Sequence, residues 1–371
     1  MSFSETLPSC LTATSTIPEK ALYSPGRYRG RALIDVICLA YGEPPQPDFL
    51  AQYRYSLSIL KRLTSQVASI PGWLLPLISA TRARKRCKQQ KELNYQTPLE
   101  SISRAFVKQL ESVLSKTTKD PYRVSLIYEF RKPFLINHLK SCEENPPDQI
   151  ILVPLYLADS TFTSGLSKKD VARYRLQNAN ASKIPHPVQV PLPASDDHFA
   201  RIVSRHILAE AQKKGFLREE LKNASLVLGA HGTLVEPPEG LDNGLEQTEN
   251  HIHQVKAELE PVFKSIHYGW LNHKRGGKWT EPDMEDLSRE LEQKGEKLIF
   301  YYPIGFVADN TETQLEGPLC FASTPVFHTL DCLNLNPEFV DWVASRVLEQ
   351  AGCKSELKQT AKDRDQAGVV L

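Results

Sequence analysis

Two short stretches of this chain carry titratable side chains in places where reaction chemistry is common. His231 lies in GAHGTL, directly after the apolar run SLVL, and Asp309, Glu312 and Glu316 lie in PIGFVADNTETQLEG, after another apolar run. A neutral imidazole can accept a proton near pH 7 or bind a metal, and crowded carboxylates tolerate one another when a cation lies among them. Each stretch alone also fits a structural role, because a lone strand-end histidine is usually packed and acidic residues stabilise the first turn of a helix.

Other familiar catalytic patterns are absent from the sequence. It has no GxGxxG, GxxxxGK[ST], HExxH or GxSxG motif. Its seven cysteines form no CxxC pair, and their odd number indicates free thiols and a reducing compartment. Cys320, Cys332 and Cys353 lie late in the chain, but their wide spacing argues against an iron–sulfur cluster. We therefore expect no tightly bound cofactor.

The length and charge of the chain exclude several classes of protein. Its 371 residues favour two domains over a single core. The 45 Lys and Arg residues balance 44 Asp and Glu residues, whereas a nucleic-acid-binding protein would need a basic excess. The first 30 residues lack the basic start and apolar core of a signal peptide, and no apolar run approaches the length of a membrane span. These features predict a cytoplasmic protein without nucleic-acid partners, acting as a monomer or a dimer.

Apolar runs alternate with helical patterns along the chain. The runs ALIDVICLAYG, YRVSLIYEF, QIILVPLY, SLVLGAHG and EKLIFYYPIGF are nearly continuous, which is the pattern of strands covered on both faces. Segments with helical periodicity, such as TPLESISRAFVKQLESVLSK and DDHFARIVSRHILAEAQKKG, lie between them. The predicted fold class is α/β, with two doubly wound Rossmann-like domains, parallel sheets and an active site in the cleft between the domains.

The same patterns divide the chain into segments. We expect a disordered extension over residues 1–30, an N-terminal α/β domain over 31–190, a C-terminal α/β domain over 191–335, a helix over 336–352 that packs back on the body, and a flexible tail over 353–371. Within the first domain, SIPGWLLPLIS followed by RARKRCK predicts an apolar lip near residues 68–90 with a basic flank. Thr97 is predicted to be the N-cap of the next helix, with Glu100 completing a capping box.

The order of these motifs resembles the ferrochelatase family of class II chelatases. AYGEPP, YQTPLESISRAF, LVPLY with STFTSG, GAHG and YPIGFVADNTETQLE follow one another as in that family, from about Ile34 to Ala351. Ferrochelatases insert ferrous iron into a porphyrin and release two pyrrole protons. The resemblance implies an enzyme of haem biosynthesis, with a porphyrin and Fe²⁺ as its substrates.

The resemblance also implies roles for individual residues. His231 matches the family's essential histidine, as proton acceptor and metal contact, and Glu312 matches the glutamate that faces it and relays iron and protons. Tyr41 matches the tyrosine that approaches the metal from the opposite face of the macrocycle in the Gram-positive-type enzymes. The remaining matches are Asp309 and Glu316 as a secondary acidic relay, and Thr97 and Arg131 as porphyrin contacts.

Several positions depart from the family pattern and indicate a divergent member. Asn310 stands where the family commonly has a histidine, and Gly229 replaces a serine two residues before the essential histidine. Glu129 and Phe130 replace a basic–aromatic or basic–histidine pair, which moves a porphyrin contact to Arg131.

The leading hypothesis is a ferrochelatase, and Tyr41 favours coproporphyrin III over protoporphyrin IX as its porphyrin. A neutral histidine and weak oxygen ligands suit a reaction in which iron is bound briefly and handed on. The alternatives are a chelatase for another metal or tetrapyrrole, and a degenerate chelatase that binds or carries haem or porphyrin. Intact His231 and Glu312 favour the enzyme, whereas Asn310 and Glu129 favour the carrier. The apolar lip is also a candidate for peripheral contact with a membrane surface.

Overall fold

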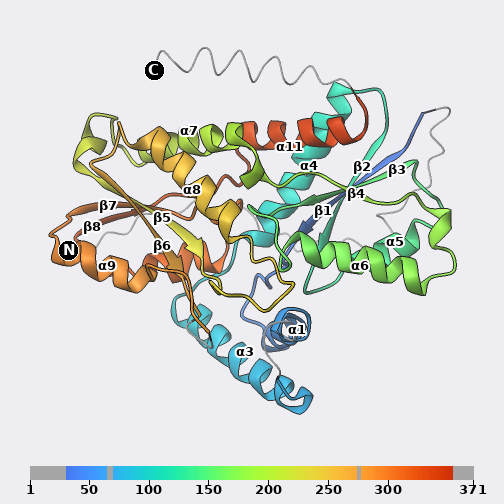
Figure 1. Cartoon of the computed structure of the whole chain (residues 1–371), viewed down its shortest axis with the longest axis horizontal. Coiled ribbons are helices and arrows are strands. Elements are labelled where there is room, and N and C mark those ends of the chain that lie inside the picture. Colours follow the sequence, from blue (N-terminus) through green and yellow to red (C-terminus); the bar gives the residue numbers. More distant parts are fainter. Residues whose placement is uncertain (1–30, 65–69, 274–276, 354–371) are drawn as a thin grey trace.

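The structure consists of two parallel β-sheets with helices around them (Figure 1). This computed structural model describes residues 31–64, 70–273 and 277–353. The expected extension over residues 1–30, and all but the first residue of the expected tail, lie outside the described residues. Helices α7 (Asp197–Lys213) and α11 (Pro337–Gln350) run along one edge of the molecule in Figure 1, and α8 (Leu245–Leu259) packs against α7.

Each half of the chain contributes one four-stranded sheet. The order is β2–β1–β3–β4 in the first half and β6–β5–β7–β8 in the second, and every strand pair is parallel. The central strands are buried along almost their whole length, as their continuous apolar runs predict. The predicted α/β fold with two parallel sheets is confirmed. The strands are β1 (Ile34–Ala40), β2 (Tyr122–Tyr128), β3 (Gln149–Pro154), β4 (Val188–Gln189), β5 (Ser225–His231), β6 (Ser265–Leu271), β7 (Leu298–Tyr302) and β8 (Val326–Thr329).

A pair of helices in the first half, called the lip below, includes most of the segment over residues 68–90 that was expected to form an apolar lip. Helix α1 (Phe49–Ile59) packs against α3 (Leu75–Glu92), and Figure 1 shows this pair projecting from the edge opposite α7 and α11. Ala83 and Cys87 of α3 are buried, whereas Arg82 and Arg84 are exposed, so the basic flank faces outward. None of the helices in the described ranges is both long and apolar enough to cross a membrane. The remaining long helices are α4 (Leu99–Thr117), α5 (Leu135–Ser141), α6 (Ser164–Gln177) and α9 (Met284–Gln293).

One hydrophobic cluster joins the two halves. It contains Val36 of β1 and Leu226 of β5, together with residues of the helices between the sheets. Helix α11 follows the second sheet but packs against α4 of the first half, where the rings of Phe339 and Phe106 have centroids 5.2 Å apart. Because protein interiors are close-packed, this shared cluster holds the two sheets in one relative position.

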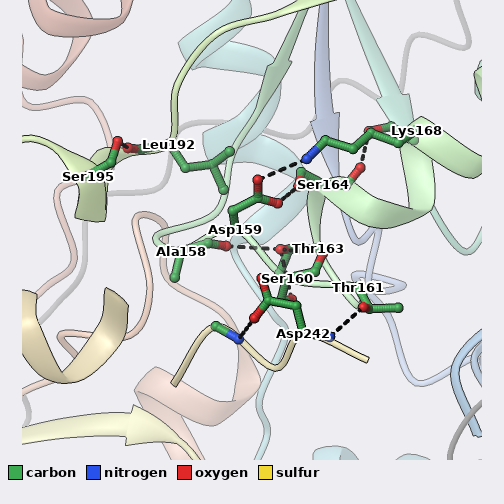
Figure 2. A network of polar contacts seen from close by, with 12 residues as sticks. Ala158, Asp159, Ser160, Thr161, Thr163, Ser164, Lys168, Leu192, Ser195 and Asp242 are labelled. Atoms are coloured by element: carbon green, nitrogen blue, oxygen red, sulfur yellow. Dashed lines mark hydrogen bonds and ion pairs between the residues drawn. The ribbon is translucent and has the colours of Figure 1, made fainter. Parts of the chain in front are cut away.

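A polar network joins the halves at another place (Figure 2). The backbone N–H of Thr161 donates to the carbonyl of Asp242 over 2.8 Å, and the N–H of Asp242 donates to the Thr161 hydroxyl over 3.0 Å. The Asp159 carboxylate accepts hydrogen bonds from Ser164 and, over 2.9 Å, from Lys168 of α6. The STFTSG and LDNG stretches therefore meet each other, and together they tie the first half to the second.

The start of α4 differs from the sequence prediction. Pro98 is the N-cap of the helix, and in the described structure Thr97 makes no capping hydrogen bond. The Thr97 hydroxyl instead donates to a carboxylate oxygen of Glu43 over 2.9 Å, and the Glu100 carboxylate accepts from Arg104. A hydrogen bond to an ionised carboxylate is stronger than one between neutral groups. The predicted capping box is therefore wrong, because Glu43 takes the Thr97 hydroxyl, and Arg104 and Arg131 take the Glu100 carboxylate.

Candidate active site

His231 ends β5, and its side chain emerges at the carboxyl edge of the second sheet. The residues before it on β5 are buried, whereas its own side chain is 45% exposed. The loop after β7 reaches the same edge, since the N–H of Gly305 donates to the carbonyl of Gly229 over 3.2 Å. A Cβ atom at Gly305 would lie only 3.0 Å from the Cα of Ala230. Glycine at this position lets the loop cross β5 closely and carry its acidic residues to His231.

His231 and Glu312 form a direct hydrogen-bonded pair. The distance between His231 Nδ1 and Glu312 Oε2 is 2.8 Å. Burial disfavours the charged imidazole, but the charge of Glu312 and this hydrogen bond outweigh it, so the pKa of His231 lies above its ordinary value. Burial likewise opposes ionisation of Glu312, but His231 holds the pKa of that carboxyl below its ordinary value. Each member of the pair thus favours the charged form of the other.

Glu312 begins a short π-helix (Glu312–Glu316) that continues a helical stretch starting at Thr311, and Asn310 caps the start of that stretch. The Asn310 side-chain oxygen accepts from the backbone N–H groups of Glu312, over 2.8 Å, and Thr313, over 3.3 Å. Asparagine is a preferred N-cap because its short side chain reaches these otherwise unpaired donors. The residue that replaces the family's histidine thus fixes the backbone from which Glu312 projects.

Glu316 lies at the other end of this π-helix and contacts the lip. Its Oε1 atom lies 2.8 Å from Nη2 of Arg86 on α3. Burial and the negative charge of Glu312 raise the pKa of Glu316, and Arg86 opposes that shift. The ring of His273 packs edge-on to His231 with centroids 5.1 Å apart. The family resemblance assigned no role to His273, and Arg86 was only one member of the basic flank RARKRCK.

Asp309 faces away from this pair. It is buried, and its Oδ1 atom accepts from the backbone N–H of Cys332 and the hydroxyl of Thr313. Its Oδ2 atom accepts from the side chain of Asn334 over 2.5 Å. These contacts anchor the 303–317 loop to the segment after β8. The structure therefore brings Glu312 and Glu316 close to His231, whereas Asp309 anchors the loop that carries them.

Tyr41 follows β1 and lies in the wall contributed by the first half. Its ring centroid is 4.7 Å from that of Tyr156 and 5.4 Å from that of Phe130, and its hydroxyl donates to the carbonyl of Phe162 over 3.3 Å. Burial raises the pKa of Tyr41, and the charges of Glu312 and Glu129 add to the shift. The Tyr41 ring is therefore close enough to Glu312 for the charge of that residue to act on it, although the two belong to different halves of the chain.

Arg131, predicted as a porphyrin contact, has partners within the first half. Its Nε atom donates to the carbonyl of Gly42 over 2.9 Å, and its Nη2 atom donates to the Glu100 carboxylate over 2.7 Å. Its guanidinium also lies 3.9 Å from the ring centroid of Tyr128. Together with the bond from Thr97 to Glu43, these contacts place both predicted porphyrin-binding residues beside Tyr41 rather than beside His231.

The glycine that replaces a serine two residues before His231 has a packing reason. A Cβ atom at Gly229 would collide with the ring of Tyr301, and a Cβ atom at Gly317 would collide with the same side chain from the other side. Tyr301 is fully buried beneath the π-helix. The two glycines therefore admit a large ring that supports the backbone carrying the acidic residues.

Glu129 is a buried acid where the family has a basic residue. Its Oε2 atom lies 3.0 Å from Nη2 of Arg62, and the same guanidinium nitrogen lies 2.8 Å from Oδ2 of Asp170. Burial raises the pKa of Glu129 to about 7, although Arg62 opposes the shift. A positive charge is still present beside Glu129, because Arg62, a residue far away in the sequence, contacts it.

A separate group of potential metal ligands lies near the start of β1. Asp35, His138 and Cys142 are all buried, with ligand atoms within 4.8 Å of one another. Arg123 already occupies this group, because its Nε and Nη2 atoms donate to the two oxygens of Asp35 over 2.9 and 2.8 Å. Burial raises the pKa of Cys142 to about 12, so its sulfur stays a thiol, which is a poor metal ligand. The group is a closed ion cluster.

Known proteins resemble this chain along most of its length. The family model for Ferrochelatase matches residues 34–351. The ferrochelatase of Geotalea daltonii is 24% identical over 298 residues, which cover 76% of this chain and 88% of that protein. The coproporphyrin III ferrochelatase of Oceanobacillus iheyensis is 27% identical over 288 residues, which cover 71% of this chain and 83% of that protein.

A solved structure shares the fold. SirB from Bacillus subtilis with Fe³⁺ aligns with a TM-score of 0.50 at 14% identity, covering 85% of this chain and 94% of that chain. At this identity the likeness shows the fold alone. The family model spans both sheets and the stretches that hold His231 and Glu312. The chain therefore belongs to the ferrochelatase family, a family of metal-inserting enzymes.

Proposed function

We propose that the chain inserts Fe²⁺ into a porphyrin in haem biosynthesis. The supporting observation is the 2.8 Å pair of His231 Nδ1 and Glu312 Oε2 at the carboxyl end of β5, with Tyr41 in the opposite wall. In open α/β folds, ligands bind beyond the carboxyl ends of the strands. A base paired with a carboxylate at this edge suits a reaction in which a metal enters as protons leave.

His231 is the proton acceptor in this proposal. When Nδ1–H donates to Glu312, the lone pair of Nε2 is directed to take a proton from a pyrrole nitrogen, and the Glu312 charge stabilises the imidazolium that forms. Each Fe²⁺ replaces two pyrrole protons, so the pair must release the first proton before it accepts the second. Glu316, at the far end of the π-helix, is the next carboxylate on the way outward.

Ferrous iron is a substrate that must bind briefly and leave. The carboxylates of Glu312 and Glu316 offer weak oxygen ligands, and His231 offers one nitrogen. Such ligands attract Fe²⁺ without the strong retention of a thiolate site. The proposal therefore includes no tightly bound cofactor and no iron–sulfur cluster.

Coproporphyrin III is the porphyrin that we favour over protoporphyrin IX. The position of Tyr41 supports it, and the Oceanobacillus iheyensis relative carries that substrate in its name. Arg131 and Thr97 are the proposed contacts for porphyrin carboxylates. Each would exchange a present partner, Glu100 for Arg131 and Glu43 for Thr97, for a carboxylate of the substrate.

A porphyrin or haem carrier is the second candidate function, and a chelatase for another metal or tetrapyrrole is a third. The buried acid Glu129 favours the carrier, since it stands where the family has a basic residue. The His231–Glu312 pair favours the enzyme, because mere binding of a porphyrin needs no base.

We place the protein in the cytoplasm, and the lip is the proposed site of its peripheral contact with a membrane surface. Trp73 is 72% exposed and Leu77 is 60% exposed at the tip of the lip, and Arg82 and Arg84 are exposed farther along α3. An exposed aromatic and aliphatic tip with a basic flank suits the boundary of an anionic bilayer.

The proposal is tested by incubating the purified protein anaerobically with Fe²⁺ and each porphyrin in turn, and following metalloporphyrin absorbance. We expect product with coproporphyrin III at a higher kcat/KM than with protoporphyrin IX. Porphyrin binding without product for either porphyrin would support the carrier. Product with Co²⁺ or Zn²⁺ but not with Fe²⁺ would support a different chelatase.

A further inference from the structure

Glu43 is a buried acid between the two halves; it lies in the AYGEPP motif, but the sequence analysis assigned it no role. It lies two residues after Tyr41, and only 8% of its surface is exposed. Gly42 between them has a φ of +82°, and a Cβ atom there would lie 2.7 Å from the Tyr128 side chain. Only glycine fits this tight left-handed turn. The backbone therefore fixes the direction in which the Glu43 side chain leaves the Tyr41 loop.

The Glu43 carboxylate accepts three hydrogen bonds, two of them from the other half of the chain. Its Oε1 atom accepts from the Thr311 hydroxyl over 2.5 Å, and its Oε2 atom accepts from the Thr311 backbone N–H over 3.2 Å. The Thr97 hydroxyl provides the third bond, over 2.9 Å. Hydrogen bonds to a charged acceptor are stronger than neutral ones and cost more to lose when buried.

Thr311 directly precedes Glu312, so these bonds bear on the proposed reaction. The path from Tyr41 through Gly42 and Glu43 to Thr311 and Glu312 crosses from one wall of the cleft to the other within a few residues. Asn310 holds the same backbone from the other side, through its cap of the Glu312 N–H. The Glu312 backbone is thus fixed both within its own half and against the Tyr41 loop.

We infer that Glu43 is a positioning residue for metal insertion, which sets the placement of Glu312, and through it of His231, relative to Tyr41. This inference rests on the proposed function. Glu43 does not touch the reacting atoms; it determines whether groups on the two walls stand at the spacing that a porphyrin between them requires. Misplacement of a reacting group by about 1 Å can lower a rate about 10²-fold.

The test compares Glu43→Gln with Thr311→Val. Glutamine keeps the size of the side chain, but its amide nitrogen cannot accept a hydrogen bond from a threonine hydroxyl. Valine keeps the shape of Thr311 and removes only the hydroxyl. We expect each variant to lower kcat roughly 10-fold to 10²-fold while KM for the porphyrin stays within about threefold. Thr311→Ser, which keeps the hydroxyl, is expected to retain kcat within about twofold of wild type.

Glu338→Gln is the matched control. Glu338 also joins two elements, through its ion pair with Arg205 between α11 and α7, but it lies outside the cleft. We expect its kcat to match wild type. If Glu43→Gln kept the wild-type kcat, or lowered it no more than Glu338→Gln, the inference would be overturned. It would also fail if Thr311→Val raised KM and left kcat unchanged.

Hydrogen–deuterium exchange of residues 309–319 is a readout that needs no turnover. We expect faster exchange of these amides in Glu43→Gln and Thr311→Val than in wild type or Glu338→Gln. If the wild-type protein inserted no metal, the proposed function would fail. The exchange experiment would still test whether the bonds between Glu43 and Thr311 hold the backbone before Glu312. Unchanged exchange in both variants would refute the positioning role of Glu43, whatever the enzyme assay showed.

Discussion

Two clusters of similar side chains lie at opposite ends of the parallel strands, and they differ in how far their polar atoms are buried and bonded. Near the start of β1, Asp35 is fully buried, and both of its oxygens are bonded to Arg123, with His138 as a further partner. At the carboxyl end of β5, His231 and Glu312 bond only one pair of atoms, and the imidazole is 45% exposed. Histidine and carboxylate are common to both, so residue type alone does not distinguish a structural cluster from a reactive one.

The difference appears in the protonation of each cluster. Burial would raise the pKa of Asp35, but the hydrogen bonds and charges of Arg123 and His138 outweigh it and hold that pKa below its ordinary value. At the open cluster, burial lowers the pKa of His231, but Glu312 outweighs burial and raises that pKa above its ordinary value, while the imidazole stays partly exposed. A closed cluster stabilises the fold, whereas an open one retains the capacity to react.

The largest expected effect is that of His231→Ala on metal insertion. Removing a general base lowers kcat about 10²-fold to 10⁴-fold. Because the side chain is half exposed, we expect the midpoint of urea unfolding and the affinity for porphyrin to change little. Anaerobic insertion assays and porphyrin fluorescence titrations measure the two quantities separately. Normal turnover in this variant would place the base elsewhere.

Asp35→Asn tests the closed cluster and is expected to act on stability instead. Removing one partner of a buried ion pair costs about 3 kcal/mol or more of the free energy of unfolding, because a charge is left uncompensated. The folded-state pKa of Asp35 is lowered, so its stabilising contribution is present above the ordinary aspartate pKa and lost as the pH falls below it. Urea unfolding at neutral and acidic pH measures this, and kcat per folded molecule should match wild type. A selective loss of kcat would end the distinction between the clusters.

Glu312→Gln sharpens the comparison through the pH dependence of the rate. We expect kcat to fall about 10-fold to 10²-fold. His231 must be neutral to accept a proton, so kcat/KM rises with pH through its pKa, which lies above the ordinary value while Glu312 is charged. The variant lacks that charge, and the rising limb of its pH–rate profile should move to lower pH. If the rising limb of the profile stayed in place, or moved equally in Asp35→Asn, then Glu312 would not be the residue that sets the pKa of the catalytic base.

The smallest expected effect is that of Cys142→Ala. The thiol lies 3.4 Å from an Asp35 oxygen and donates only a weak hydrogen bond, so its loss should cost about 1 kcal/mol or less. Because Arg123 fills the cluster, the metal content of the purified protein should be the same with and without the cysteine. Loss of one equivalent of iron or zinc in the variant would show that the cluster binds metal after all.

The sequence predicted much of this arrangement and missed identifiable parts of it. Nearly continuous apolar runs correctly predicted buried parallel strands, and they placed His231 at a strand end. The prediction at Thr97 was wrong, because a capping box is read from neighbours in sequence while the hydroxyl is taken by Glu43. Asn310 looked like a lost relay residue, yet it caps the π-helix. Both positions depend on hydrogen bonds whose geometry the one-dimensional pattern does not contain.

The sequence by itself determined the two sheets, their strand ends and the stretches that hold His231 and Glu312, because hydrophobic periodicity and turn residues are local properties of the chain. Only the tertiary structure decided that Asp309 anchors its loop instead of facing His231, and that Arg123 closes the cluster at Asp35. It also decided that Glu43 meets Thr311, a residue 268 positions away. Contacts at such separations form only when both sheets have packed on their shared core, so they follow from the packing of the whole chain.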